Sequence, residues 1–284
     1  MLTHTLGEAN MALNKIMNPI EKYNQRAKKI NSLLCVGLDA DYEKLPEQYK
    51  NLEGGEAQFQ FNKYIIDTTH EYAAAFKPNA AFYEARGMGG MEALKKTIKY
   101  IKENYPDIFT ILDAKRADIG NTNNGYVVSV FDWLKFDAIT VHPDLGSEAL
   151  APFLERKEKC TIVLGKTSNK GGGEFQDLIL DNGEILWQYI AKKVSNEWNK
   201  NNNLMLVVGG TYPEEIAKAR ELTGEMTLLV PGIGAQGGDV KSVVELGKNS
   251  EGLGLIISSS RGIIFAEDPG AEAKKLRDEI NLYR

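Results

Sequence analysis

Apolar residues in this chain gather in short continuous runs that recur along its length, with polar and helix-like stretches between them. Strands of a parallel sheet that is covered on both faces read as continuous apolar runs of this kind. We therefore predict strands at Leu33–Leu38, Ala74–Lys77, Ile108–Leu112, Ala138–Val141, Thr161–Leu164, Met205–Val208, Thr227–Val230 and Leu255–Ile257.

Helical patterns lie between these runs. Leu94, Ile98 and Ile101 recur at helical spacing, and a second pattern has Pro213 at its start and Gly224 at its end. Strand–helix alternation repeated eight times predicts an α/β fold, a (β/α)₈ or TIM barrel forming a single domain. A doubly wound sheet is the alternative, but no G-x-G-x-x-G motif follows the first run, as a dinucleotide-binding fold would require.

No low-complexity linker divides the chain. We expect residues 1–30 to be a helical or partly disordered N-terminal extension of unknown role, and residues 31–284 to form the barrel and its catalytic site. Residues 170–173 and 232–238 are rich in glycine and directly follow strands, which is typical of functional loops.

Composition excludes several classes of function. The net charge is −5 and no block of Lys and Arg is present, so we expect no nucleic-acid partner. The N-terminal region carries charges and no long apolar run, so we expect neither a signal peptide nor a membrane span, and a cytoplasmic location. Cys35 and Cys160 stand in apolar runs and are expected to be buried thiols; no Cys/His cluster has the spacing of a zinc site.

Polar residues concentrate where the predicted strands end, which in a barrel is the face that carries the chemistry. Asp113, Lys115 and Asp118 follow the third run. Asp113 and Lys115 are two residues apart, so on a regular strand both point into the barrel mouth. An ammonium between carboxylates stays charged, which suits a proton donor and not a Schiff-base nucleophile. Asp39 and Lys77 end two other runs and enlarge the cluster; an ordinary structural ion-pair cluster is the alternative.

The loops after the last two strands predict a phosphate site, because barrels commonly bind phosphate there. They read PGIGAQGGD and SSSRGI, and they contain Pro231, Gln236, Arg261 and Gly262. Glycines let backbone N–H groups approach an anion, and an arginine can donate two parallel hydrogen bonds to it. A glycine-rich turn beside a solvated arginine is the alternative. Ser168 and Asn169 could contact a pyrimidine or cap a loop.

The segment DAKRADIGNT, residues 113–122, resembles the signature of the orotidine 5′-monophosphate decarboxylase family. The longer bacterial branch of that family is similar over most of the chain. It shows LCVGLD, FKPNAAFYE, KTSN and PGIGAQGGD at the corresponding strand ends. The resemblance implies decarboxylation of orotidine 5′-monophosphate to UMP, the last step of de novo UMP synthesis, with no metal and no organic cofactor.

The resemblance also implies roles for single residues. Lys115 would give a proton to the ring carbon that loses CO₂, and Asp113 would face the substrate carboxylate. Asp118 and Thr122 would reach the site of a neighbouring subunit, which implies a homodimer with shared sites. Asp39 and Lys77 would hold the ribose hydroxyls and the charge network, and Lys77 would count with Lys115, Asp113 and Asp118 as catalytic. The remaining residues would bind substrate: Ser168 (or its neighbour Thr167) at the pyrimidine, Pro231 and Gln236 in a closing loop, and Arg261 with Gly262 at the phosphate.

Two alternatives remain open. One is a metal-dependent phosphosugar decarboxylase or synthase built on the same type of barrel, because such enzymes carry a similar D-x-K-x-x-D element. The other is a non-catalytic barrel that binds a nucleotide. Two carboxylates close to an anionic substrate argue against the second, because binding alone would not need them.

Overall fold

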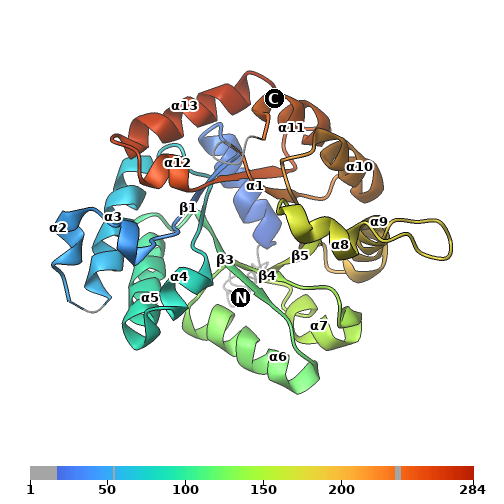
Figure 1. Ribbon diagram of the computed structural model, residues 1–284, viewed down its shortest axis with the longest axis horizontal. Coiled ribbons are helices and arrows are strands. Elements are labelled where there is room, and N and C mark those ends of the chain that lie inside the picture. Colours follow the sequence, from blue (N-terminus) through green and yellow to red (C-terminus); the bar gives the residue numbers. More distant parts are fainter. Residues whose placement is uncertain (1–17, 54, 234–237) are drawn as a thin grey trace, which may run out of the picture.

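Eight parallel strands form a closed barrel in the computed structural model, which describes residues 18–53, 55–233 and 238–284. Helices surround the strands on the outside, as Figure 1 shows. The strands are β1 (Leu34–Gly37), β2 (Ala75–Lys77), β3 (Phe109–Arg116), β4 (Ala138–Val141), β5 (Cys160–Lys166), β6 (Leu204–Val208), β7 (Leu228–Pro231) and β8 (Leu255–Ser259). The predicted fold and all eight predicted strands are confirmed.

The strands follow one another around the barrel in chain order, and β1 closes it by pairing with β8. The helices are α1 (Pro19–Lys29), α2 (Glu47–Lys50), α3 (Glu56–Thr69), α4 (Ala80–Glu84), α5 (Gly87–Asn104), α6 (Gly120–Val127), α7 (Gly146–Leu154), α8 (Gly173–Gln176), α9 (Leu186–Lys192), α10 (Pro213–Thr223), α11 (Val240–Gly247), α12 (Arg261–Ile264) and α13 (Pro269–Asn281). Short 3₁₀ segments η1 (Tyr42–Lys44) and η3 (Lys170–Gly172) and π-helical segments η2 (Val128–Trp133) and η4 (Lys193–Trp198) complete the chain.

The two helices predicted from sequence are present. The apolar positions Leu94, Ile98 and Ile101 are the buried side of α5. Helix α10 begins at Pro213 and ends before Gly224, whose positive φ of 58° is a conformation that glycine adopts without steric cost. Both cysteines are buried and free, as expected.

Helix α1 covers the end of the barrel at which the strands begin. Asn18 caps it by accepting a hydrogen bond from the N–H of Ile20, and Tyr23 donates its hydroxyl to the carbonyl of Leu255 at the start of β8. Arg26 donates to the carbonyls of His70 and Ala73, just before β2. Residues 1–17, on which the predicted disorder falls, lie outside the described part of the chain. No helix among the described residues is long and apolar enough to cross a membrane.

An ion cluster lies at the same end of the barrel. Asp137, just before β4, accepts hydrogen bonds from Lys22 at 2.9 Å and Lys102 at 2.5 Å, and also from the backbone N–H and hydroxyl of Thr110. Burial by itself would raise the pKa of Asp137, but the charges of Lys102 and Lys22 outweigh it and lower that pKa. The cluster therefore joins α1 and α5 to the barrel through one buried carboxylate.

Asp137→Asn should lower the free energy of unfolding by about 3 kcal/mol, because Lys22 and Lys102 lose a buried counter-charge. Urea unfolding at neutral pH measures this effect. The wild-type contribution should be present above the ordinary aspartate pKa and lost as the pH falls through the lowered one. Asp132→Asn is the matched control, because its half-exposed pair with Arg156 is worth at most about 1 kcal/mol. Equal losses in the two variants would contradict the prediction.

Candidate active site at the carboxyl ends of the strands

Three charged side chains form a connected row at the mouth of the barrel. Lys77, at the end of β2, lies 2.8 Å from Oδ2 of Asp113 in β3. Lys115 lies 2.7 Å from the other carboxylate oxygen of Asp113. The Lys77 side chain is 7% exposed and that of Asp113 is 13% exposed, whereas 43% of the Lys115 side chain is exposed. Lys115 is therefore the member of the row that a ligand can reach most easily.

The row is electrostatically self-consistent. Burial alone would raise the pKa of Asp113, but Lys77 and Lys115 outweigh burial and hold that pKa well below its usual range. Burial alone would lower the pKa of Lys77, but the charges of Asp113 and Asp39 raise it instead. Asp113 is therefore a fixed negative charge and Lys77 a fixed positive charge at neutral pH.

The end of β3 is irregular. Its pairing with β4 shifts register between Leu112 and Arg116, and Lys115 has a φ of 47°, in the left-handed region. A regular strand with side chains alternating across it was predicted here, and this part of the prediction is wrong. Asp113 and Lys115 do meet, but through a locally distorted backbone.

Asp39 follows β1 and lies close enough to Lys77 to raise its pKa. Its Oδ1 atom is buried and has no hydrogen-bond partner among the residues of the structure that are described. A buried carboxylate oxygen without a donor is costly, so it is suited to accept a hydrogen bond from a ligand hydroxyl.

Asp118 and Thr122 lie apart from this row. Within the described chain, no ion pair links Asp118 to Lys115. Asp118 accepts a hydrogen bond from the N–H of Ile119 and is otherwise held through the backbone by Asn123. Thr122 is exposed on α6. One chain therefore assembles Lys77, Asp113 and Lys115 directly, but leaves Asp118 and Thr122 on the surrounding surface.

The segment after β5, which contains Ser168, is held in place by side-chain contacts of the residues at its start. The buried Lys166 pairs with Asp177 and lies 3.4 Å from Glu215 at the start of α10. Gln176 accepts from the N–H of Thr167 and donates to its hydroxyl. Lys166 begins the KTSN segment, but its partners Asp177 and Glu215 and the supporting Gln176 were not predicted, because they lie outside that segment and share no motif with it.

Ser168 itself packs against the end of β6. A Cβ atom on Gly209 would lie 2.8 Å from both N and Cα of Ser168, so only glycine allows the two segments this close. The position of Ser168 is therefore set by β6 on one side and by the Lys166 and Gln176 contacts on the other.

The predicted phosphate residues lie at the ends of β7 and β8. Pro231 is the last residue of β7, and Arg261 is the exposed first residue of α12. A Cβ atom on Gly262 would meet nothing within 4 Å, so open space surrounds it. No ion pair within the described residues uses the Arg261 side chain, which leaves its guanidinium available to an anion. Gln236 lies outside the described residues.

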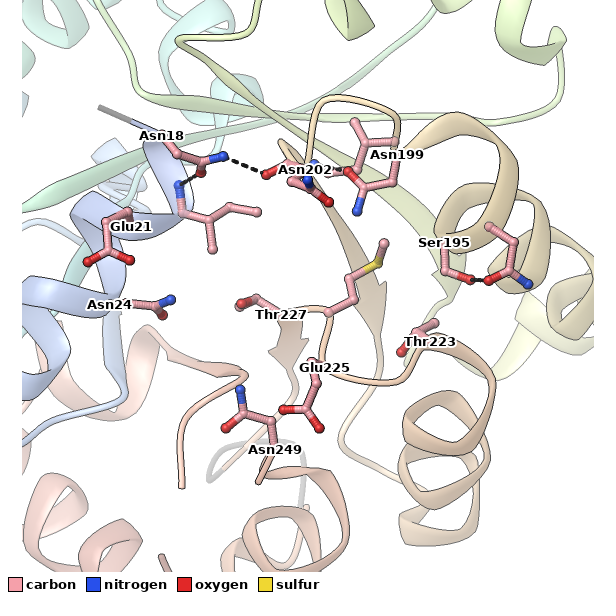
Figure 2. A pocket seen from close by; sticks show the side chains of 14 residues that line it. Asn18, Glu21, Asn24, Ser195, Asn199, Asn202, Thr223, Glu225, Thr227 and Asn249 are labelled. Carbon is pink, nitrogen blue, oxygen red and sulfur yellow. Dashed lines mark hydrogen bonds between the residues drawn. The ribbon is translucent and has the colours of Figure 1, made fainter. Parts of the chain in front are cut away.

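No group of three His, Cys, Asp or Glu side chains in the described ranges is arranged to hold a metal ion. A cleft of about 820 Å³ lies at the opposite end of the barrel, where the strands begin (Figure 2). Two of its amides support the fold: Asn18 donates to the carbonyl of Asn202 and so links the start of α1 to the turn before β6, and Asn199 accepts from the N–H of Leu204 within that turn. None of the predicted site residues lines this cleft.

Comparison with known proteins adds independent information. The model of the orotidine 5′-phosphate decarboxylase / HUMPS family matches residues 32–276. This chain belongs to that family. Orotidine 5′-phosphate decarboxylase of Cellvibrio japonicus is 46% identical over 275 residues, which cover 94% of this chain and all of that protein. The enzyme of the same name from Flavobacterium johnsoniae is 47% identical and covers 87% of this chain and 89% of its own.

Solved structures agree with these relatives. The structure of Leishmania donovani OMP decarboxylase superposes with a TM-score of 0.84 at 40% identity, and it covers 94% of this chain and 99% of that one. A structure described as a putative orotidine-monophosphate-decarboxylase from Toxoplasma gondii has a TM-score of 0.86 at 34% identity, covering 93% and 96% of the two chains. The resemblance read from the sequence is thereby confirmed.

Proposed function

We propose that this protein removes the carboxylate of orotidine 5′-monophosphate and releases UMP and CO₂, the last step of de novo UMP synthesis. Relatives named orotidine 5′-phosphate decarboxylase, 43–47% identical over most of the chain, support the reaction. The structural observation that supports this reaction is the Lys77–Asp113–Lys115 row at the barrel mouth. The enzyme is a carboxy-lyase.

The chemistry assigned to the row is proton transfer with charge stabilisation. When the bond between the ring and the carboxylate breaks, its electron pair stays on the ring carbon in the plane of the ring, where the π system cannot delocalise it. The Lys115 ammonium stabilises this charge and then gives the carbon a proton, and the neutral amine regains a proton from solvent. Asp113 faces the substrate carboxylate, and loss of CO₂ relieves their repulsion.

Substrate binding uses the surrounding residues. Arg261 and the open backbone at Gly262 bind the phosphate, together with Pro231 and Gln236 from the loop after β7. Asp39 and Lys77 bind the ribose hydroxyls, and Ser168 contacts the pyrimidine. Binding energy from the phosphate and ribose, which do not react, can be used to hold the ring in its reactive position.

We further propose a homodimer in which Asp118 and Thr122 complete the partner's site. Asp118 has no cation partner among the described residues of its own chain, although it follows Lys115 by only three positions. Ile119, the next residue, is 63% exposed, and Leu145, just before the neighbouring helix α7, is 47% exposed. An apolar surface around an unpaired carboxylate at the barrel mouth suits an interface between two copies. The two buried free thiols suit a reducing cytoplasm.

The direct test is the ultraviolet absorbance of orotidine 5′-monophosphate mixed with the purified protein and excess EDTA. We expect the substrate band to disappear and UMP to form, because the proposed chemistry uses only side chains. No change in this substrate, together with Mg²⁺-dependent activity on a phosphosugar, would indicate a metal-dependent phosphosugar enzyme instead. No turnover by a folded protein that still binds UMP would indicate a nucleotide-binding barrel.

A further inference from the structure

The hydroxyl of Thr140, in the middle of β4, makes three hydrogen bonds to the end of β3. It accepts from the backbone N–H of Ala114 at 3.0 Å and from that of Lys115 at 2.9 Å. It donates to Oδ1 of Asp113 at 3.0 Å, the same oxygen that the Lys115 ammonium contacts. One side chain therefore touches both the backbone and the charged row of the candidate site.

The hydrogen bonds to Thr140 replace backbone hydrogen bonds that the end of β3 would make to β4 if the pairing were regular. The register with β4 shifts between Leu112 and Arg116. The N–H of Asp113 still bonds to the carbonyl of Pro78, but those of Ala114 and Lys115 have no regular strand partner. Thr140 is only 1% exposed, so water is poorly placed to satisfy them. Unpaired N–H groups at this depth cost free energy, and the threonine hydroxyl removes that cost.

The conformation of Lys115 also needs support. A φ of 47° is unfavourable for a residue with a side chain, and such conformations persist only where neighbouring structure holds them. A hydroxyl has one proton and two lone pairs, and in Thr140 all three are in use. Because the two N–H groups occupy the lone pairs, the proton is directed to Asp113.

We propose that Thr140 is a positioning residue: it holds the distorted end of β3 so that the Lys115 ammonium and the Asp113 carboxylate keep their reactive arrangement. The proposal rests on the proposed roles of Lys115 and Asp113, but it concerns a residue of a different strand that does not touch the reacting atoms. Thr140 affects the rate through placement of Lys115, and phosphate and ribose binding do not depend on it.

Thr140→Val tests this directly, because valine keeps the shape and removes the hydroxyl. We expect kcat to fall about 100-fold, the scale of a small misplacement of a catalytic group. KM should stay within about threefold, because the residues that bind phosphate and ribose are untouched. A smaller folded fraction would also lower the apparent kcat at constant KM, so kcat is expressed per folded molecule, with the folded fraction taken from thermal unfolding. On that scale a purely structural role leaves kcat unchanged, whereas a positioning role keeps the loss.

Two variants serve as controls. Thr140→Ser keeps the hydroxyl and should recover most of the lost kcat. Thr161→Val removes a buried hydroxyl from the neighbouring strand β5 that has no hydrogen-bond partner in the described structure, so its kcat should match the wild type. Steady-state kinetics of the three variants, with thermal unfolding of each, complete the comparison.

Several outcomes would overturn the proposal. Wild-type kcat in Thr140→Val would show that the hydroxyl is dispensable, and failure of Thr140→Ser to recover would show that the hydroxyl is not the cause. An equal loss of kcat in Thr161→Val would show that replacing a buried threonine by valine lowers kcat wherever it is made in these strands. If Thr140→Val does not fold, Thr140→Ala replaces it, and full kcat there overturns the proposal. An inactive wild type would instead contradict the proposed function.

Discussion

Lys115→Ala should abolish turnover, with kcat lower by at least about 10⁴-fold. The variant loses the proton donor and the positive charge beside the developing carbanion, and each of these alone is worth about 10²-fold or more. Lys77 cannot replace it, because its ammonium is held against the other oxygen of Asp113 and is almost fully buried. The measurement is loss of substrate absorbance at saturating substrate.

A control variant and a binding measurement show whether the loss of turnover comes from the missing Lys115 ammonium. Arg116→Ala removes the neighbouring cation of the same strand, which pairs with Glu84 and forms no ion pair with Asp113, so kcat should stay within about threefold. UMP binding by Lys115→Ala, followed by calorimetry, should persist and so exclude unfolding. Turnover close to the wild-type rate would remove Lys115 from the mechanism.

A mixture of two inactive variants should regain activity. Asp118→Ala and Lys115→Ala are each expected to be nearly inactive as pure dimers. If Asp118 completes the site of the partner subunit, a mixed dimer places both substitutions in one site and leaves the other site intact. Random exchange then gives about a quarter of wild-type activity, because about half of the dimers are mixed and each has one working site. The assay is turnover after unfolding and refolding the two proteins together.

The matched control mixes Lys115→Ala with Asp113→Ala. Both residues act in the site of their own chain, so every mixed dimer has two damaged sites and no activity should return. Affinity tags of two kinds show whether subunits have exchanged. Exchange without recovery in the Asp118 mixture would show that Asp118 does not act across subunits.

The barrel could be predicted from sequence because its strands are buried on both faces, so each strand is a continuous run of apolar residues. Residues 138–141 are an example, since all four are buried in β4. Strand β3 was predicted to stop at Leu112, yet it continues to Arg116. Its last part carries charges and not apolar residues, so the apolar pattern ends before the strand does.

The charged residues of the site could be predicted in part. Lys77, Asp113 and Lys115 were placed together because carboxyl ends of barrel strands share one face, and they do meet. Thr140 could not be found this way, because a β-branched residue inside an apolar run reads as a packing position. Its role depends on the register shift in β3, which arises from contacts between two strands.

The closure of the barrel by β1 and β8 has a consequence for synthesis on the ribosome. Asp39, Lys77, Asp113 and Lys115 all leave the ribosome long before β8 and Arg261, which lie more than a hundred residues later in the chain. Until β8 is made, one edge of β1 has no strand to pair with, and the charged row exists without its phosphate site. The nascent chain therefore carries an exposed sheet edge for most of its translation, and binding of the nucleotide can stabilise only the finished barrel.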